Sequence, residues 1–269
     1  LNFRNSTVDL RTGALRPHDK AAHITKLIDA DYVPDAQCPR WLRFLDEVFA
    51  GDKDMVAFAQ RALGYSVSGS TEEQVLFIAC GPGNNGKSVF CEVALRALGT
   101  DYARNTPSET IMSQDRTAIP NDVAALRGVR LVVVRETMEG RWLSTARVKE
   151  LTGGDTVSAR FMRAEWFSFT PSFKLLLGTN HKPRAHGDDP ALWRRIRLLP
   201  FKFTVPPEKR NKRLVEELLD KERQGILAWM VQGALQWQRQ RGLGEPAAVL
   251  NATAEYQDDC DDLSEFLEV

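Results

Sequence analysis

The feature that most constrains the fold of this chain is the run GPGNNGKS at residues 81–88, which fits the pattern G-x-x-x-x-G-K-[ST]. The apolar run VLFIAC, from Val75 to Cys80, precedes it, and a stretch with helical periodicity, SVFCEVALRALG, follows it and stops at Gly99. A strand, a glycine-rich loop and a helix in this order are the context in which the pattern forms a phosphate-binding loop. We therefore expect a nucleotide triphosphatase.

In such a loop, backbone N–H groups from Gly83 to Ser88 can surround a β-phosphate, and the helix N-terminus adds about half a positive charge. Lys87 is expected to reach the β- and γ-phosphates, and the Ser88 hydroxyl to complete the shell of a Mg²⁺ ion between them. A glycine-rich turn without a ligand is the alternative interpretation. The expected nucleotide contacts are Gly81, Pro82, Gly83, Asn84, Asn85, Gly86, Lys87, Ser88 and Val89.

Two further apolar runs predict buried strands. They are RLVVVRE, from Arg130 to Glu136, and FKLLLGTN, from Phe173 to Asn180, and each ends in polar residues. Strands that alternate with helical stretches are typical of a three-layer α/β core built mainly on parallel strands. We expect this fold class here.

Polar residues at the ends of these strands are the catalytic candidates. Hydrolysis requires a carboxylate that polarises water and helps to hold the metal, and Glu136 closes the second strand, so Ser88 and Glu136 are the expected metal ligands. The usual motif has two adjacent acids, but Arg135 occupies the first position, which leaves Glu136 to serve both roles with Glu139 nearby. Asn180 is the candidate sensor of the γ-phosphate or the attacking water. An exposed strand-end carboxylate and an ordinary turn asparagine are the alternative interpretations.

Two arginines, Arg194 and Arg195, follow Trp193 and precede another apolar run. An arginine that reaches across a subunit boundary could neutralise charge developing on the γ-phosphate of a neighbour. A solvated strand edge would have the same sequence. From the residues alone, both interpretations stay open.

The flanking segments predict smaller attachments to the core. Residues 1–20 alternate around Thr12-Gly13 as a β-hairpin would, and two helices are expected between Pro39 and Gly64. After Pro207, the chain is helical in pattern and ends in an acidic helix or linker. We expect an N-terminal hairpin and helical subdomain at residues 1–65, the ATPase core at 66–205 and a C-terminal helical segment at 206–269.

Composition excludes several classes of protein. The 269 residues include 43% hydrophobic residues but no apolar run of the roughly 20 residues that a membrane helix needs. Four widely spaced cysteines fit neither a zinc site nor a disulfide scaffold, so a cytoplasmic protein is expected. The 36 basic and 36 acidic residues give no net charge, which is unlike a protein that binds nucleic acid over its whole surface.

Six ordered segments together resemble one family, the superfamily three helicases, and specifically the phage and plasmid primase-helicases related to poxvirus primase-helicase. The resemblance covers nearly the whole chain. The segments are CPRWLRFLDEVFAGD, GPGNNGKS, RLVVVRETMEG, VKELTGGDTVSARFM, KLLLGTNHKPR and DDPALWRRIRLLPF.

This resemblance implies an AAA+-like core that assembles as a ring, usually a hexamer, and uses ATP to pull single-stranded DNA through its channel with 3′-to-5′ polarity. It places Lys87 and Ser88 at the phosphate and metal contacts, Glu136 at the Walker B acid and Asn180 at the first sensor. Arg195 matches the arginine finger and Arg194 is the runner-up. A primase domain outside these residues and a phage, plasmid or integrated element as source are also implied, with the bacterial host cytoplasm as the expected location.

The segment from Thr156 to Ser172 resembles the family's hairpin that projects into the channel and grips DNA. Related sequences commonly place a lysine near its tip, where this chain has Arg163-Ala164-Glu165. Arg163, supported by Arg160 and adjacent to Ala164, is therefore the expected DNA contact. Trp166 and Phe167 could stack on bases, but packing at the base of the hairpin is favoured.

Two other classes of function are weighed against a helicase. A P-loop kinase or GTPase is disfavoured because the surroundings of Asn180 lack the aspartate that reads guanine and because kinases need no arginine in trans. A replication initiator or oligomerisation module with a weak ATPase is the alternative that Arg135, in place of an acid, keeps open.

Overall fold

The structure, a computed structural model of the 269-residue chain, describes residues 1–113, 121–135 and 139–267. The helices are α1 (Pro39–Val48), α2 (Lys53–Ser68), α3 (Lys87–Leu98), α4 (Asn121–Ala124), α5 (Thr145–Thr152), α6 (Pro190–Trp193), α7 (Leu214–Gln240) and α8 (Ala247–Leu267). The strands are β1 (Thr7–Val8), β2 (Leu15–Arg16), β3 (Leu76–Cys80), β4 (Ala103–Thr106), β5 (Leu131–Val134), β6 (Val157–Ala159), β7 (Phe167–Phe169), β8 (Lys174–Thr179) and β9 (Ile196–Pro200).

A five-stranded sheet in the order β4-β5-β8-β3-β9 forms the centre of the molecule, and all of its neighbouring strands are parallel. Val134 pairs with Leu177, and Cys80 pairs with Thr179. The carboxyl ends of β3, β5 and β8 therefore meet at one edge of the sheet, as parallel strands require. All three strands lie where the apolar runs predicted them.

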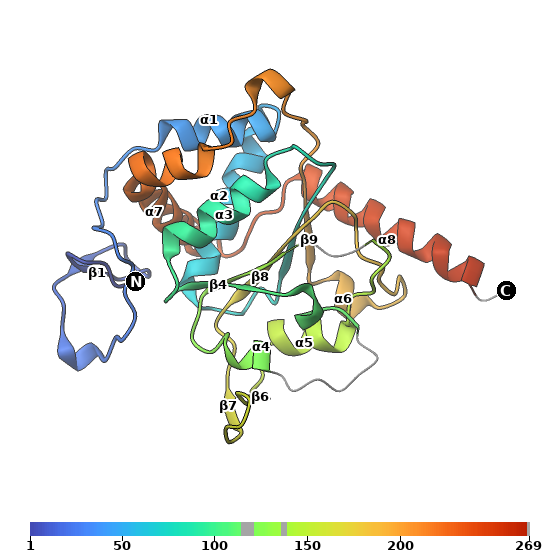
Figure 1. Cartoon of the computed structure of the whole chain (residues 1–269), viewed down its shortest axis with the longest axis horizontal. Coiled ribbons are helices and arrows are strands. Elements are labelled where there is room, and N and C mark those ends of the chain that lie inside the picture. Colours follow the sequence, from blue (N-terminus) through green and yellow to red (C-terminus); the bar gives the residue numbers. More distant parts are fainter. Residues whose placement is uncertain (114–120, 136–138, 268–269) are drawn as a thin grey trace.

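Alternate side chains of the sheet enter two separate hydrophobic clusters. Phe77 and Ala79 pack on the side of α1, α2, α3 and α7, whereas Leu76 and Ile78 pack on the side of α5, α6 and α8. Figure 1 shows the sheet between these two helical layers. The expected three-layer α/β core with parallel strands is confirmed.

Helix α2 differs from its predicted extent. A helix ending before Gly64 was expected, but α2 runs to Ser68 and is capped by Gly69 in the left-handed conformation. Gly64 stays helical because it lies against α7, where a Cβ atom would approach the backbone nitrogen of Ala234 to 2.2 Å. Close packing between helices, not chain reversal, explains this glycine.

Two small hairpins and one long helix extend from the core (Figure 1). The predicted N-terminal hairpin is confirmed, with β1 antiparallel to β2. A second hairpin, β6 with β7, lies within the segment expected to grip DNA. Helix α8 packs along the edge strand β9, where the Leu198 amide donates to the Thr253 hydroxyl at 3.1 Å. Within the described ranges, no helix has the length and apolarity to cross a bilayer.

Candidate nucleotide site

The expected phosphate-binding loop joins β3 to α3 at the carboxyl edge of the sheet. Gly86 precedes the first turn of α3 with φ +89°, and a Cβ atom there would meet the Val48 side chain at 2.6 Å. Gly83, by contrast, has nothing within 4 Å of the position of such an atom. The loop is thus held against α1 at one glycine and left open at another, where a phosphate can approach the backbone.

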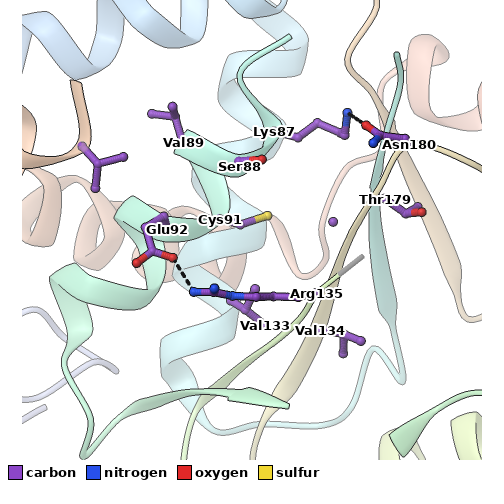
Figure 2. Close-up of a pocket in the computed structure, with 12 residues that line it drawn as sticks. Lys87, Ser88, Val89, Cys91, Glu92, Val133, Val134, Arg135, Thr179 and Asn180 are labelled. Atoms are coloured by element: carbon purple, nitrogen blue, oxygen red, sulfur yellow. Dashed lines mark hydrogen bonds and ion pairs between the residues drawn. The ribbon is translucent and has the colours of Figure 1, made fainter. Parts of the chain in front are cut away.

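Lys87 is only 6% exposed and is held inside the loop. Its Nζ donates to the carbonyl oxygens of Gly81 at 2.6 Å and Pro82 at 3.1 Å, and to the Oδ1 atoms of Asn85 and Asn180, both at 2.9 Å. Figure 2 shows the contact from Lys87 to Asn180, which joins the loop to the end of β8. The expected sensor and the expected phosphate lysine are therefore in direct contact.

Two cavities flank this loop. One, of about 390 Å³, lies between α3 and the ends of β5 and β8, and Figure 2 shows the side chains that line it, including Lys87, Ser88 and Asn180. The other, of about 500 Å³, lies between the loop, α1 and the segment at residues 205–214. Lys209, Arg210 and Lys212 line this second cavity. A phosphate on the loop would thus have an open volume on each side.

The expected acid, Glu136, lies outside the described residues, so its roles as catalytic base and metal ligand stay predictions. Ser88 is exposed at the first turn of α3 and lines the first cavity. Glu139, the expected assistant, is exposed, with its Oε1 3.9 Å from Nδ1 of His181. Of the two expected metal ligands, the structure describes Ser88, whose hydroxyl is of a type that binds Mg²⁺ in phosphate loops.

An ion pair that sequence reasoning missed borders the first cavity. Arg135 directly follows β5, and its Nη2 is 2.9 Å from Oε2 of Glu92 on α3 (Figure 2). Both residues line the cavity together with Lys87 and Ser88. The signal was present in the sequence, because Glu92 follows Ser88 by four residues and so shares its helix face.

The two arginines after α6 have different environments. Arg195 is 6% exposed, and its guanidinium donates to Gln74 Oε1, Thr152 Oγ1 and the Ala191 carbonyl. Arg194 is exposed, with one contact at 3.2 Å to the same Gln74 oxygen. The Arg195 carbonyl also accepts from the amide that opens β3, which puts both arginines at the edge of the sheet opposite the loop. Arg195, the expected finger, is therefore bound inside its own subunit, and Arg194 is the one at the surface.

The β6–β7 hairpin carries the expected DNA contacts. Arg163 and Ala164 are exposed in the turn, where Arg163 has φ +61°. Arg160 lies with its guanidinium 5.0 Å from the centre of the Trp166 ring, and Trp166 is 56% exposed. Phe167 instead contacts the rings of two neighbouring phenylalanines. Packing at the base of the hairpin was favoured for both Trp166 and Phe167. Phe167 packs in this way, whereas Trp166 is exposed.

This chain is similar to two protein-family models and to several viral proteins. A family model described as D5 N terminal like matches residues 1–50, and a family of unknown function, DUF5906, matches residues 79–195. "Putative helicase L207/L206" of Acanthamoeba polyphaga mimivirus is 26% identical over 99% of this chain, and "Putative helicase 121R" of Invertebrate iridescent virus 3 is 28% identical over 99%. This chain spans 30% and 32% of their lengths. "Putative primase C962R" of African swine fever virus is 24% identical over 67% of this chain, which spans 18% of it.

A solved structure has a similar fold. The apo structure of the NrS-1 C-terminal region aligns with 75% of this chain at a TM-score of 0.58 and 14% identity, and the match covers 47% of that region. The helicase and primase names of the viral relatives confirm the kinship that the six sequence segments predicted.

Proposed function

We assign this chain to the phage and viral primase-helicase family, and we propose that it is the ATP-dependent motor of a ring-forming DNA helicase. In this proposal the chain moves 3′-to-5′ on single-stranded DNA during phage or plasmid replication and works beside a primase domain. The observation that carries the proposal is the contact of 2.9 Å between Lys87 and Asn180 at one cavity, which supports Lys87 as the phosphate lysine and Asn180 as the sensor.

The residues around the loop fit a bound ATP and Mg²⁺. A triphosphate would replace the carbonyl and amide oxygens that Lys87 now contacts, since the three donors of an ammonium group prefer charged phosphate oxygens. Mg²⁺ would supply charge neutralisation between the β- and γ-phosphates, with Ser88 as a ligand and Glu136 as the proposed second one. The Asn180 amide would then contact the attacking water or the γ-phosphate. Lys87 would keep its place at the loop while changing partners.

Completion of the site requires a second subunit. Arg194 lies at the opposite edge of the sheet from the phosphate loop of its own chain, so it cannot serve that loop directly. Its exposure supports Arg194 as the finger that contacts the nucleotide of a neighbour. The burial of Arg195 and its three acceptors support a structural role for that residue. A closed ring, which we propose is a hexamer, would supply every site with one such arginine.

The β6–β7 hairpin is the proposed grip on DNA. Arg163 in its turn and Arg160 beside Trp166 place positive charge and an exposed aromatic ring together. This combination binds a single strand through phosphate contacts and base stacking with little dependence on sequence. A few basic residues repeated around a ring would suffice, which is compatible with a chain of zero net charge.

Hydrolysis and unwinding measurements test the proposal. The wild-type protein is expected to hydrolyse ATP faster with single-stranded DNA and to unwind a duplex with a 3′ tail but not one with a 5′ tail. Lys87→Ala is expected to lower turnover by at least about 100-fold, because removal of a preorganised charge at the transferred phosphate has effects of that size. Full ATPase activity in Lys87→Ala would contradict the proposal.

The same measurements address the remaining alternative. An initiator or oligomerisation module with a weak ATPase would assemble with an ATP analogue and DNA, as judged by its mass in solution, yet show no hydrolysis. Competition between ATP and GTP would separate both functions from a GTPase.

A further inference from the structure

The proposed function assigns no role to the Arg135–Glu92 pair in the first cavity. Among the described residues that line this cavity, the charged ones are Lys87, Glu92 and Arg135. Lys87 is accounted for by the phosphate loop. The other two are an acid and a base that face each other across the space between α3 and β5 (Figure 2).

The Arg135–Glu92 pair lies where the terminal phosphate of a bound nucleoside triphosphate would be expected. Ser88 and Glu92 lie one turn apart on the same face of α3, and Arg135 follows β5 beside β8, the strand that leads to Asn180. Ser88, Arg135 and Asn180 line a single cavity. The group of a nucleotide that would enter this cavity from Lys87 and Ser88 is the terminal phosphate, because the loop itself encloses the β-phosphate.

The pair is open to solvent and can separate. The side chain of Arg135 is 62% exposed and that of Glu92 is 32% exposed, and a single contact at 2.9 Å joins them. Exposed pairs of this kind contribute little net stability. An arginine bound to a phosphate through two parallel hydrogen bonds is held more strongly, because its planar fork matches the phosphate oxygens.

We propose that Arg135 binds the γ-phosphate of a nucleotide bound to its own chain, and that its guanidinium leaves Glu92 to do so. This inference rests on the proposed function. Arg135 then distinguishes triphosphate from diphosphate, because only the triphosphate reaches the cavity. Glu92 holds Arg135 in the nucleotide-free protein and competes with the phosphate for it. Arg135, which occupies the position of the first acid in the usual two-acid motif, thus strengthens the binding of a triphosphate.

Binding of a non-hydrolysable ATP analogue and of ADP, both with Mg²⁺, tests this inference on the whole chain. Arg135→Ala is expected to weaken binding of the analogue about 10- to 100-fold, the range for one lost hydrogen-bonded charge. ADP binding is expected to change by less than about twofold, because ADP has no group in the cavity. Arg135→Lys is expected to recover part of the loss. Glu92→Gln, which frees Arg135, is expected to tighten binding of the analogue and leave ADP unchanged.

Two control variants make the result decisive. Arg96→Ala removes another exposed arginine of α3, paired with Glu216 at 3.1 Å, and should change neither affinity. Lys87→Ala should weaken both nucleotides. If Arg135→Ala weakens both nucleotides equally, or neither, the inference is overturned while the proposed function stands. Failure of the wild-type protein to bind either nucleotide would overturn both.

Discussion

Gly86 and Gly83 lie three residues apart in the proposed phosphate-binding loop, but different contacts constrain them. Gly86 has φ +89° and lies against Val48 of α1, so this position requires a residue that adopts the left-handed conformation and has no Cβ atom. Gly83 has a conformation open to other residues and free space around it. Gly86 maintains the shape of the loop, and Gly83 leaves room for a ligand.

Alanine substitutions at these two glycines are expected to have different effects, on the stability of the fold at Gly86 and on nucleotide binding at Gly83. Gly86→Ala should lower the free energy of unfolding by about 2–4 kcal/mol, as left-handed strain adds to a clash in the core. Gly83→Ala should change it by less than about 0.5 kcal/mol and yet weaken nucleotide binding, because a methyl group then occupies the approach to the loop. Denaturant unfolding and nucleotide titration of both variants provide the measurement. Equal destabilisation by the two substitutions would contradict this assignment.

The buried guanidinium of Arg195 is expected to stabilise the fold. Arg195→Ala removes a buried charge that makes three hydrogen bonds, so it should lower the free energy of unfolding by about 3 kcal/mol. Arg194→Ala, the matched control at an exposed position, should change it by less than about 0.5 kcal/mol. Thermal or denaturant unfolding separates the two variants. Wild-type stability of Arg195→Ala would show that its contacts do not hold β9 in place.

At the scale of secondary-structure elements, α2 and α7 are packed backbone to backbone. Gly64 of α2 faces Ala234, and a Cβ atom on Gly233 of α7 would lie 2.1 Å from the Gln60 carbonyl. These helices come from the predicted N-terminal subdomain and C-terminal segment, yet they share one hydrophobic cluster with the sheet. The boundaries predicted at residues 65 and 205 stay predictions about domain organisation.

Gly233→Ala is expected to push α7 away from α2. The contact is with backbone, which cannot rotate aside, so the free energy of unfolding should fall by about 2–3 kcal/mol despite the better helix propensity of alanine. Lys221→Ala, on an exposed face of α7, is the control and should be neutral. An unchanged unfolding midpoint in Gly233→Ala would show that the two helices have room to adjust.

Helix α8 contacts the loop that connects Asn180 to the two arginines. The Tyr256 hydroxyl donates to the Pro183 carbonyl, and the Lys182 ammonium lies 2.6 Å from Asp259. Burial, with smaller contributions from neighbouring thiols, holds the pKa of Tyr256 well above its ordinary value, so this donor stays protonated. The acidic segment, expected as a helix or a linker, is therefore helical here and supports the chain between the expected sensor and the proposed finger.

At the scale of the whole molecule, the proposed phosphate loop and Arg194 lie at opposite edges of one sheet. A single chain cannot bring them together without unfolding its core. Subunits arranged head to tail would do so without any change of fold, because the finger edge of one would face the loop edge of the next.

Mixing of two inactive variants tests this arrangement. Lys87→Ala lacks a working loop but retains Arg194, whereas Arg194→Ala retains the loop and lacks the finger. Each alone should have little ATPase activity, and mixed rings should regain a fraction of it where an intact loop meets an intact arginine. A Lys87→Ala, Arg194→Ala double variant, mixed in the same way with Lys87→Ala, should restore nothing. Wild-type turnover by Arg194→Ala alone would exclude this role for Arg194.

The sequence alone was sufficient for the parallel strands, the glycine-rich loop between β3 and α3 and the N-terminal hairpin, because apolar runs, glycine spacing and the alternation of residue types are local along the chain. It did not identify the Arg135–Glu92 pair or the burial of Arg195 beside an exposed Arg194, and it ended α2 too early at Gly64. These features depend on which neighbours each side chain meets after folding. A pattern of residue types determines which elements form, but burial, hydrogen-bond partners and distances between elements arise only when the sheet and its two helical layers pack together.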